Sequence, residues 1–160
     1  MFDDPAMGLD VVMRREFLDA KIDLLAGSGC TVLFSSHVLT DVERIADRVG
    51  ILHEGRMLVD APLEQLKQRV LRCTWVPADP AAPPPVGPHV LRAARRRDGF
   101  DLTLLDADTG VRASLAAAGR LGEPAVPTLE ELFLDLTGPE RPGLLSEPMA
   151  DLVASRKEQP

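Results

Sequence analysis

Hydrophobic and polar positions along this 160-residue chain follow helical spacing in some stretches and strand-like spacing in others. Between residues 10 and 26, apolar side chains such as Phe17 and Leu24 recur at helical spacing, which predicts an amphipathic helix. Asp10 stands where its carboxylate can accept hydrogen bonds from the N–H groups of the first turn. The run 30–34 is short and apolar and is bounded by Gly and Ser, which predicts a central parallel strand buried on both faces.

From there to residue 70 the pattern predicts short helices and strands. They are a helix over 39–47, strands over 49–52 and 57–59 that flank a turn at Glu54-Gly55, and a helix from Pro62 to about Val70. Thr40 and Glu43 have the spacing of a capping box for the first of these helices.

The character of the chain changes from Leu71. The predicted elements are a strand over 71–76, a Pro-rich loop over 77–88, strands over 90–96 and 100–105, an Ala-rich helix over 111–121, and a helix after Thr128 that ends at Gly138-Pro139. Asp98-Gly99 is a strong hairpin signal between two of these strands. Apolar residues alternate with Asp101 and Thr103 in the second strand of the hairpin, which predicts one buried face. Thr128 and Glu131 have capping-box spacing.

Together these patterns predict an α/β fold in three parts. Residues 1–70 are expected to form part of a parallel sheet with flanking helices. Residues 71–138 are expected to form a small α+β domain. Residues 139–160 carry only a weak pattern and predict a mobile tail.

Composition narrows the class of protein. A hydrophobic fraction of 45% is ordinary for a globular chain, whereas 4% aromatic residues and a net charge of −7 argue against a nucleic-acid-binding protein. Cys30 and Cys73 have neither a metal-site spacing nor a disulfide framework, which favours a reducing, intracellular compartment. No apolar run approaches the ~20 residues of a membrane span and no signal peptide is visible, so a partner would have to supply any span.

Polar side chains follow two of the predicted strands. Asp3 and Asp4 come directly after Met1-Phe2, and Ser35, Ser36 and His37 follow the run 30–34. If the two strands are parallel neighbours, these side chains share the sheet edge where open α/β sheets bind ligands. Adjacent carboxylates suit a hydrated Mg²⁺ that shares phosphate oxygens. The plainer interpretations are an acidic turn at a frayed terminus and a structural histidine.

Two motifs point to a known family. The run Asp3-Asp4-Pro5-Ala6-Met7-Gly8-Leu9-Asp10 resembles the Walker B and D-loop segment of ATP-binding-cassette (ABC) ATPases, whose usual form is D-E-P-T-x-G-L-D. The run Phe34-Ser35-Ser36-His37 resembles their switch-histidine segment and lies at a family-like distance from the first motif. Residues 71–138 are more loosely similar to the small C-terminal extension of export-type ABC ATPase subunits.

The resemblance implies a P-loop NTPase-like sheet and a set of roles. Asp3 would hold Mg²⁺ through water, Asp4 would polarise the attacking water in place of the usual Glu, and His37 would contact the γ-phosphate. Gly8 and Asp10 would belong to the D-loop, which meets a second ATPase domain. The family uses ATP and Mg²⁺, pairs its ATPase domains, and binds a transmembrane permease, so the expected location is cytoplasmic, peripheral at the inner face of the cell membrane.

The sequence departs from the family in two ways. It contains no G-x-x-x-x-G-K-[ST] phosphate loop and no L-S-G-G-Q-like signature. We therefore expect the chain to correspond to the C-terminal portion of an ABC ATPase subunit and to bind ATP weakly by itself. In addition, Asp4 is one methylene shorter than Glu, and a displacement of about 1 Å can cost on the order of 10²-fold in rate.

Two other functional classes share features with this sequence. A non-catalytic interaction or regulatory fragment that pairs with ABC ATPase subunits stays open, so the sequence leaves open whether this chain is an enzyme. A phospho-receiver domain also places paired Asp residues after its first strand, but it needs a Lys at a later strand end. Here Lys21, Lys67 and Lys157 fall on predicted helices and the tail, which sets that class aside.

Overall fold

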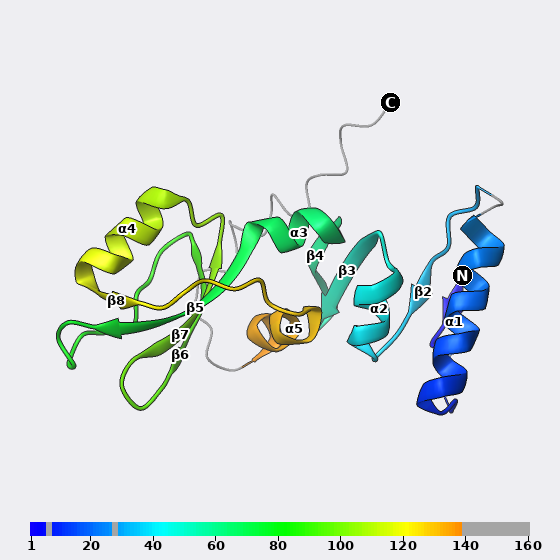
Figure 1. The fold of residues 1–160 in the computed structure, drawn as a ribbon, viewed down its shortest axis with the longest axis horizontal. Coiled ribbons are helices and arrows are strands. Elements are labelled where there is room, and N and C mark those ends of the chain that lie inside the picture. Colours follow the sequence, from blue (N-terminus) through cyan, green and yellow to red (C-terminus); the bar gives the residue numbers. More distant parts are fainter. Residues whose placement is uncertain (6–7, 27–28, 139–160) are drawn as a thin grey trace. The chain divides into compact units, whose positions relative to one another are not determined.

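The computed structural model describes residues 1–5, 8–26 and 29–138, and its elements are shown in Figure 1. The chain divides into two compact units, Met1–Ala46 and Asp47–Pro160. Residues 47–70 thus lie in the same unit as the strands that follow them. The domain boundaries predicted at residues 70 and 138 stay predictions, and the predicted tail, 139–160, lies outside the described residues.

The first unit contains a short parallel pair of strands and two helices. They are β1 (Phe2–Asp3), α1 (Val11–Ala26), β2 (Phe34–Ser35) and α2 (Leu39–Ile45). Strand β1 pairs with β2 in parallel, with Phe2 opposite Phe34 and Asp3 opposite Ser35. The Phe2 N–H donates to the Leu33 carbonyl at 2.9 Å. The predicted parallel pairing of these two segments is therefore confirmed.

The predicted buried strand over 30–34 is wrong in extent and in burial. Only its last residue, Phe34, belongs to β2, and the Leu33 side chain is exposed, at 63%. Among the described residues, β2 pairs with β1 alone. An apolar run forms a central strand only when neighbouring strands and helices bury it, and in the described residues this one has a single neighbouring strand.

Of the N-terminal caps predicted for α1 and α2, the structure confirms one and contradicts the other. Oδ1 of Asp10 accepts hydrogen bonds from the backbone N–H groups of Val12 at 3.0 Å and Met13 at 2.9 Å, which confirms the predicted cap of α1. The predicted capping box at Thr40 is wrong, because α2 begins at Leu39 and its N-cap residue is Val38, two residues before Thr40, without a side-chain cap.

Within α1 the predicted apolar stripe is only partly covered. Leu18 is buried and Phe17 is half-buried, whereas Met13 and Ala20 are exposed. The side chain of Leu24 lies outside the described residues.

The second unit begins with a hairpin and a helix. The elements are β3 (Arg48–His53), β4 (Arg56–Pro62) and α3 (Leu63–Arg69). Glu54 and Gly55, at the turn, have φ angles of 49° and 74°. Positive φ at both central residues is the requirement of a type I′ hairpin turn, so the predicted hairpin is confirmed. Pro62 is the N-cap residue of α3.

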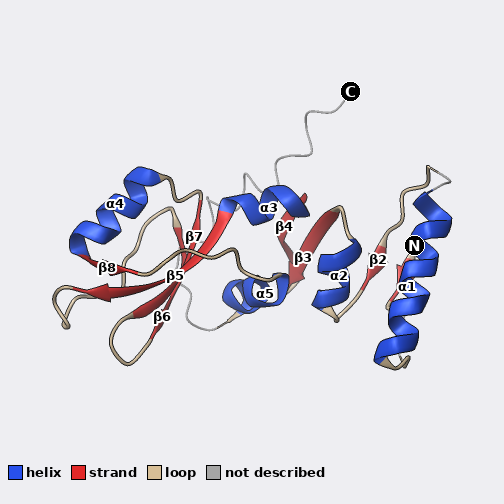
Figure 2. Ribbon diagram, viewed as in Figure 1, coloured by secondary structure: helices blue, strands red, loops and turns tan. Residues whose placement is uncertain are grey.

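An antiparallel sheet forms the larger part of this unit (Figure 2). Its strands are β5 (Val70–Pro77), β6 (Val90–Arg95), β7 (Phe100–Leu105) and β8 (Gly119–Leu121), in the order β6-β7-β5-β8. Trp75 and Phe100 lie in the buried cluster on one face, against Leu115 of α4 (Thr109–Ala118). The predicted helix over 111–121 is therefore shifted along the chain: α4 begins two residues earlier, and it ends at Ala118 because Gly119 pairs with Pro77 in the sheet.

Helix α5 (Leu129–Thr137) changes the expected burial of β7. Its predicted capping box is confirmed, because Thr128 and Glu131 exchange both hydrogen bonds. The alternation along β7 predicted a single buried face, but Thr103 is only 2% exposed and its hydroxyl donates to Asp135 of α5. Strand β7 is thus buried on both faces.

The described residues form a mixed α/β structure, which confirms the α/β fold class predicted from the sequence. In the part of the chain that the structure describes, no helix is both long and apolar enough to cross a membrane.

Candidate functional site

The candidate site lies where β1 and β2 end side by side. Because the two strands are parallel and in register, Asp3 and Asp4 reach the same edge as Ser35 and His37. The Ser35 hydroxyl donates to Oδ1 of Asp3 and accepts a hydrogen bond from the Asp4 N–H at 3.0 Å. Nδ1 of His37 is hydrogen-bonded to Oδ2 of Asp4. The structure therefore brings together the carboxylates and the histidine that the sequence placed at one sheet edge.

The backbone of Asp4 has an uncommon conformation. Its φ angle is 39°, in the left-handed region that Asp and Asn adopt more readily than most residues. The Asp4 residue is half-buried while His37 is exposed. A half-buried carboxylate that is bonded to an exposed imidazole can orient the ring and can share a proton with it.

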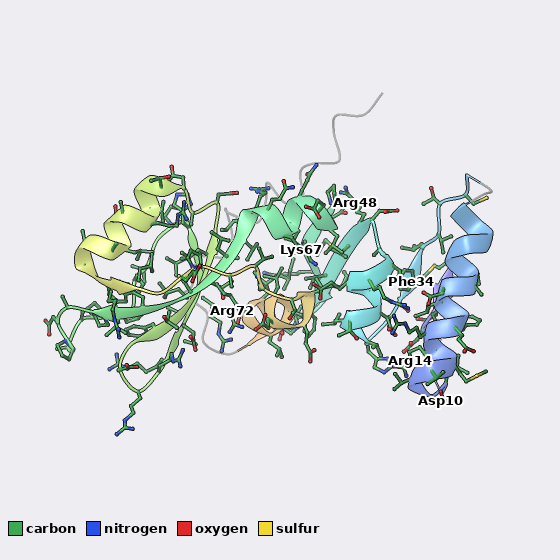
Figure 3. All side chains as sticks on the ribbon, viewed as in Figure 1. Asp10, Arg14, Phe34, Arg48, Lys67 and Arg72 are labelled. Carbon is green, nitrogen blue, oxygen red and sulfur yellow. The ribbon has the colours of Figure 1, made fainter. Side chains whose placement is uncertain are left out.

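The turn after the carboxylates is tied to both helices. Gly8 has a φ angle of 83°, which favours glycine, and Asp10 caps α1. Arg14 and Asp10 are labelled in Figure 3. Nη2 of Arg14 donates to the Leu9 carbonyl at 3.4 Å, and its Nε lies 3.9 Å from Oδ2 of Asp41 in α2. The carboxylate of Asp10 is thus occupied by its own helix, while Gly8 shapes the turn.

Two residues of this arrangement were missed by sequence reasoning. The sequence patterns give Arg14 no role, and they place Ser35 after a strand without assigning it a contact. The sequence does contain one signal for Arg14: it stands four residues after Asp10, so the two residues lie on the same side of the first helical turn. No sequence signal distinguishes Ser35 from its neighbour Ser36, since only the strand register decides which hydroxyl faces Asp3.

The oxygen atoms at this edge fit one kind of metal site. Asp3 is exposed, and its carboxylate and the Ser35 hydroxyl offer oxygen donors. In the described ranges, no group of three or more His, Cys, Asp and Glu side chains could hold a metal ion. This set fits a hydrated Mg²⁺ that completes its shell with water and phosphate oxygens, and it does not form a protein cage.

The remaining histidines lie in the second unit. Nδ1 of His89 is 3.0 Å from the Leu105 carbonyl. Nε2 of His53 is 4.0 Å from Oε1 of Glu54 at the hairpin turn. Both contacts are made between residues of the second unit.

Charged groups with shifted pKa values also lie in the second unit. The hydrogen bond from Arg69 holds the pKa of the Asp106 carboxyl below its usual value. The hydrogen bond from the Thr128 backbone N–H does the same for the pKa of Glu131. Burial raises the pKa of the Cys73 thiol. These shifts come from hydrogen bonds and burial within the fold of this unit.

Comparison with known proteins supplies the class of protein. No family model matches the chain. The chain is nevertheless similar to curated ATP-binding proteins of ABC transporters, and it matches the C-terminal region of such subunits. The family resemblance drawn from the two motifs is therefore confirmed.

Three of these relatives illustrate the match. The daunorubicin resistance ATP-binding protein DrrA3 of Streptomyces coeruleorubidus is 31% identical over 151 residues, which cover 87% of this chain and 48% of that protein. The Nod factor export ATP-binding protein I of Neorhizobium galegae is 31% identical over 147 residues, 88% of this chain and 41% of the relative. The bacitracin transport ATP-binding protein BcrA of Bacillus licheniformis is 36% identical over 69 residues, 43% of this chain and 22% of the relative. The chain thus spans about half the length of DrrA3 and less than half the length of the other two relatives.

Proposed function

We propose that this chain is the C-terminal portion of the ATP-binding subunit of an ABC exporter. The observation that carries the proposal is the contact between Asp4 and His37 beside Asp3, at the carboxyl ends of two parallel strands. The similarity to ATP-binding proteins named for daunorubicin resistance and Nod factor export supports export as the direction of transport.

In this proposal the site residues act by positioning and by charge. Asp3 holds Mg²⁺ through water, and His37 contacts the γ-phosphate of ATP. Asp4 polarises the attacking water and orients His37. Bound Mg²⁺ would neutralise charge on the phosphate oxygens. Phosphoryl transfer depends mainly on such positioning and charge neutralisation, so no covalent chemistry is required of these side chains.

The rest of the proposal concerns fold and partners. The β1–β2 pair is part of a P-loop NTPase-like parallel sheet, and the turn that contains Gly8 and Asp10 is the D-loop that contacts a second ATPase domain. A transmembrane permease subunit holds the assembly at the inner face of the cell membrane. The similarity to ABC transporter ATP-binding proteins supports these partners.

The replacement of the usual Glu by Asp4 is compatible with this role. The Asp4 carboxylate already reaches Nδ1 of His37, from a backbone in the left-handed region. The contact with His37 is thus made with the shorter side chain.

The test needs a protein that also contains a phosphate loop. The chain would be joined to the phosphate-loop half of DrrA3, and steady-state hydrolysis of Mg-ATP would be measured. Asp4→Asn and His37→Ala are each expected to lower kcat by about 10²-fold or more, because they remove a group that acts on the reacting atoms. Matched controls are Asp98→Asn at the β6–β7 turn and His53→Ala at the β3–β4 turn, which should keep the parent rate. Unchanged kcat in both site variants would overturn the proposed roles.

A non-catalytic role is the second candidate. It concerns the 160 residues by themselves, which carry no phosphate-loop motif, the element that supplies the main backbone contacts to phosphates. It predicts that the joined protein hydrolyses no ATP while the 160-residue chain still associates with an ABC ATPase subunit. Measuring hydrolysis and association on the same preparations separates the two candidates.

A further inference from the structure

One hydroxyl group connects the Asp3 carboxylate with the backbone of Asp4. Ser35 Oγ–H donates to Oδ1 of Asp3, and the same oxygen accepts the hydrogen bond from the Asp4 N–H at 3.0 Å. A serine hydroxyl has a single donor and two acceptor lone pairs. The donor is used by the side chain of Asp3 and one lone pair by the backbone of Asp4.

We propose that Ser35 is a positioning residue that aligns both carboxylates, an inference that rests on the proposed function. Its bond to Oδ1 fixes the orientation of the Asp3 carboxylate and leaves Oδ2 available to a metal-bound water. Its bond to the Asp4 N–H stabilises the left-handed backbone of Asp4, which directs that carboxylate to His37. A single hydroxyl thus sets the geometry of the metal-facing and the water-facing side chains.

The neighbouring serine provides a matched comparison. Ser36 Oγ accepts a hydrogen bond from the Val38 N–H at 3.1 Å, next to the start of α2. Ser35 and Ser36 are therefore adjacent hydroxyls with different partners. A Ser→Ala substitution at either position removes the same atoms, but only the substitution at Ser35 removes the bonds to Asp3 and Asp4.

The first test uses the 160-residue chain without nucleotide. NMR hydrogen exchange would be followed at the Asp4 amide, together with the imidazole ¹⁵N shifts of His37. In Ser35→Ala we expect Asp4 exchange to become about tenfold faster, the equivalent of one hydrogen bond, and the His37 shifts to move. Ser36→Ala should change neither signal, and Ser35→Thr, which keeps the hydroxyl, should restore both.

The second test measures the Mg²⁺ requirement of the joined protein described above. Residues that orient a metal ligand through a hydrogen bond change metal affinity by about 10- to 100-fold when removed. Ser35→Ala is therefore expected to raise the Mg²⁺ concentration for half-maximal hydrolysis by about tenfold, while Ser36→Ala leaves it unchanged. Ser35→Cys keeps the size of the side chain with a much weaker donor and should behave like Ser35→Ala.

The outcomes separate this inference from the proposed function. If Asp4→Asn and His37→Ala leave hydrolysis unchanged, the proposed function fails. If those variants lose activity but Ser35→Ala matches Ser36→Ala in amide exchange and Mg²⁺ requirement, the proposal for Ser35 is overturned and the proposed function stands. A uniform loss of activity in the Ala, Cys and Thr variants, without a change in Mg²⁺ requirement, would also overturn it.

Discussion

Asp135 offers the sharpest test of what stabilises the second unit. This carboxylate on α5 is 2% exposed. Its Oδ1 accepts from Nη1 of Arg92 at 2.6 Å, and its Oδ2 accepts from the Thr103 hydroxyl and lies 3.2 Å from Nε of Arg72. One side chain therefore connects the helix to β5, β6 and β7. Asp135→Asn keeps the shape of the side chain and removes its charge.

The burial of Asp135 determines how much stability the Asp135→Asn substitution removes. Removing one partner of a buried ion pair typically costs about 3–5 kcal/mol, because the remaining charge is left unpaired. The side chains of Arg72 and Arg92 are 29% and 20% exposed, so water compensates part of the loss. Arg72 also keeps Glu131, at 2.6 Å, as a second partner. We therefore expect Asp135→Asn to lower the free energy of unfolding by about 2–3 kcal/mol, below the full range for buried pairs.

The change in the free energy of unfolding would be measured by urea unfolding of the 160-residue chain, with tryptophan fluorescence as the signal. Trp75 is the single tryptophan, and it is buried in the sheet that α5 covers, so the signal reports this unit. Asp101→Asn is the matched control, because Asp101 pairs with Arg96 at an exposed site, where such pairs contribute about 0–1 kcal/mol. Equal losses for the two variants, or a loss below about 1 kcal/mol for Asp135→Asn, would show that the buried pairing does not stabilise the fold.

Three further predictions follow from the contacts described above. Thr128→Ala should lower the free energy of unfolding by about 1 kcal/mol in urea titrations, because it removes the side-chain bond to the Glu131 N–H; no measurable loss would refute the cap. The pKa of Asp106 is lower in the folded state, so its bond with Arg69 stabilises the fold above about pH 4, and that stability is lost as the pH falls through the folded-state pKa. Asp106→Asn should thus flatten the acid limb of stability against pH, and an unchanged limb would contradict this. Calorimetry of the 160-residue chain with Mg-ATP should give a dissociation constant weaker than micromolar, whereas tighter binding would mean that phosphates are held without a phosphate loop.

Local signals in the sequence determined most of the second unit. Several features all depend on residues within a few positions of each other: the Glu54-Gly55 and Asp98-Gly99 turns, the Thr128–Glu131 capping box, and Pro62, which is the N-cap of α3 and not its predicted first residue. The backbone conformation of such short segments is determined by the φ preferences of their residues and by hydrogen bonds from side chains to nearby backbone groups. For this reason these elements could be predicted without knowing how the sheet is assembled.

The candidate site was predictable in its composition but not in its connections. The motif runs identified Asp3, Asp4 and His37, and parallel pairing was enough to place them at one edge. Which hydroxyl contacts the Asp3 carboxylate and the Asp4 N–H depends on register, since a shift by one residue would replace Ser35 by Ser36. Roles for Asp10 and Gly8 in contacting a second ATPase domain remain predictions.

Only the tertiary structure decided what is buried. The run 30–34 has the composition of a central strand, yet in the described residues its single paired strand leaves Leu33 exposed. Conversely, Asp135 and Thr103 are polar residues that a sequence pattern assigns to the surface, and they are buried because α5 packs across β7. Burial is a property of long-range neighbours, and a polar residue can be buried when those neighbours supply its hydrogen bonds. The local pattern fixes where helices and turns form, whereas the partners that lie far along the chain decide which face becomes the core.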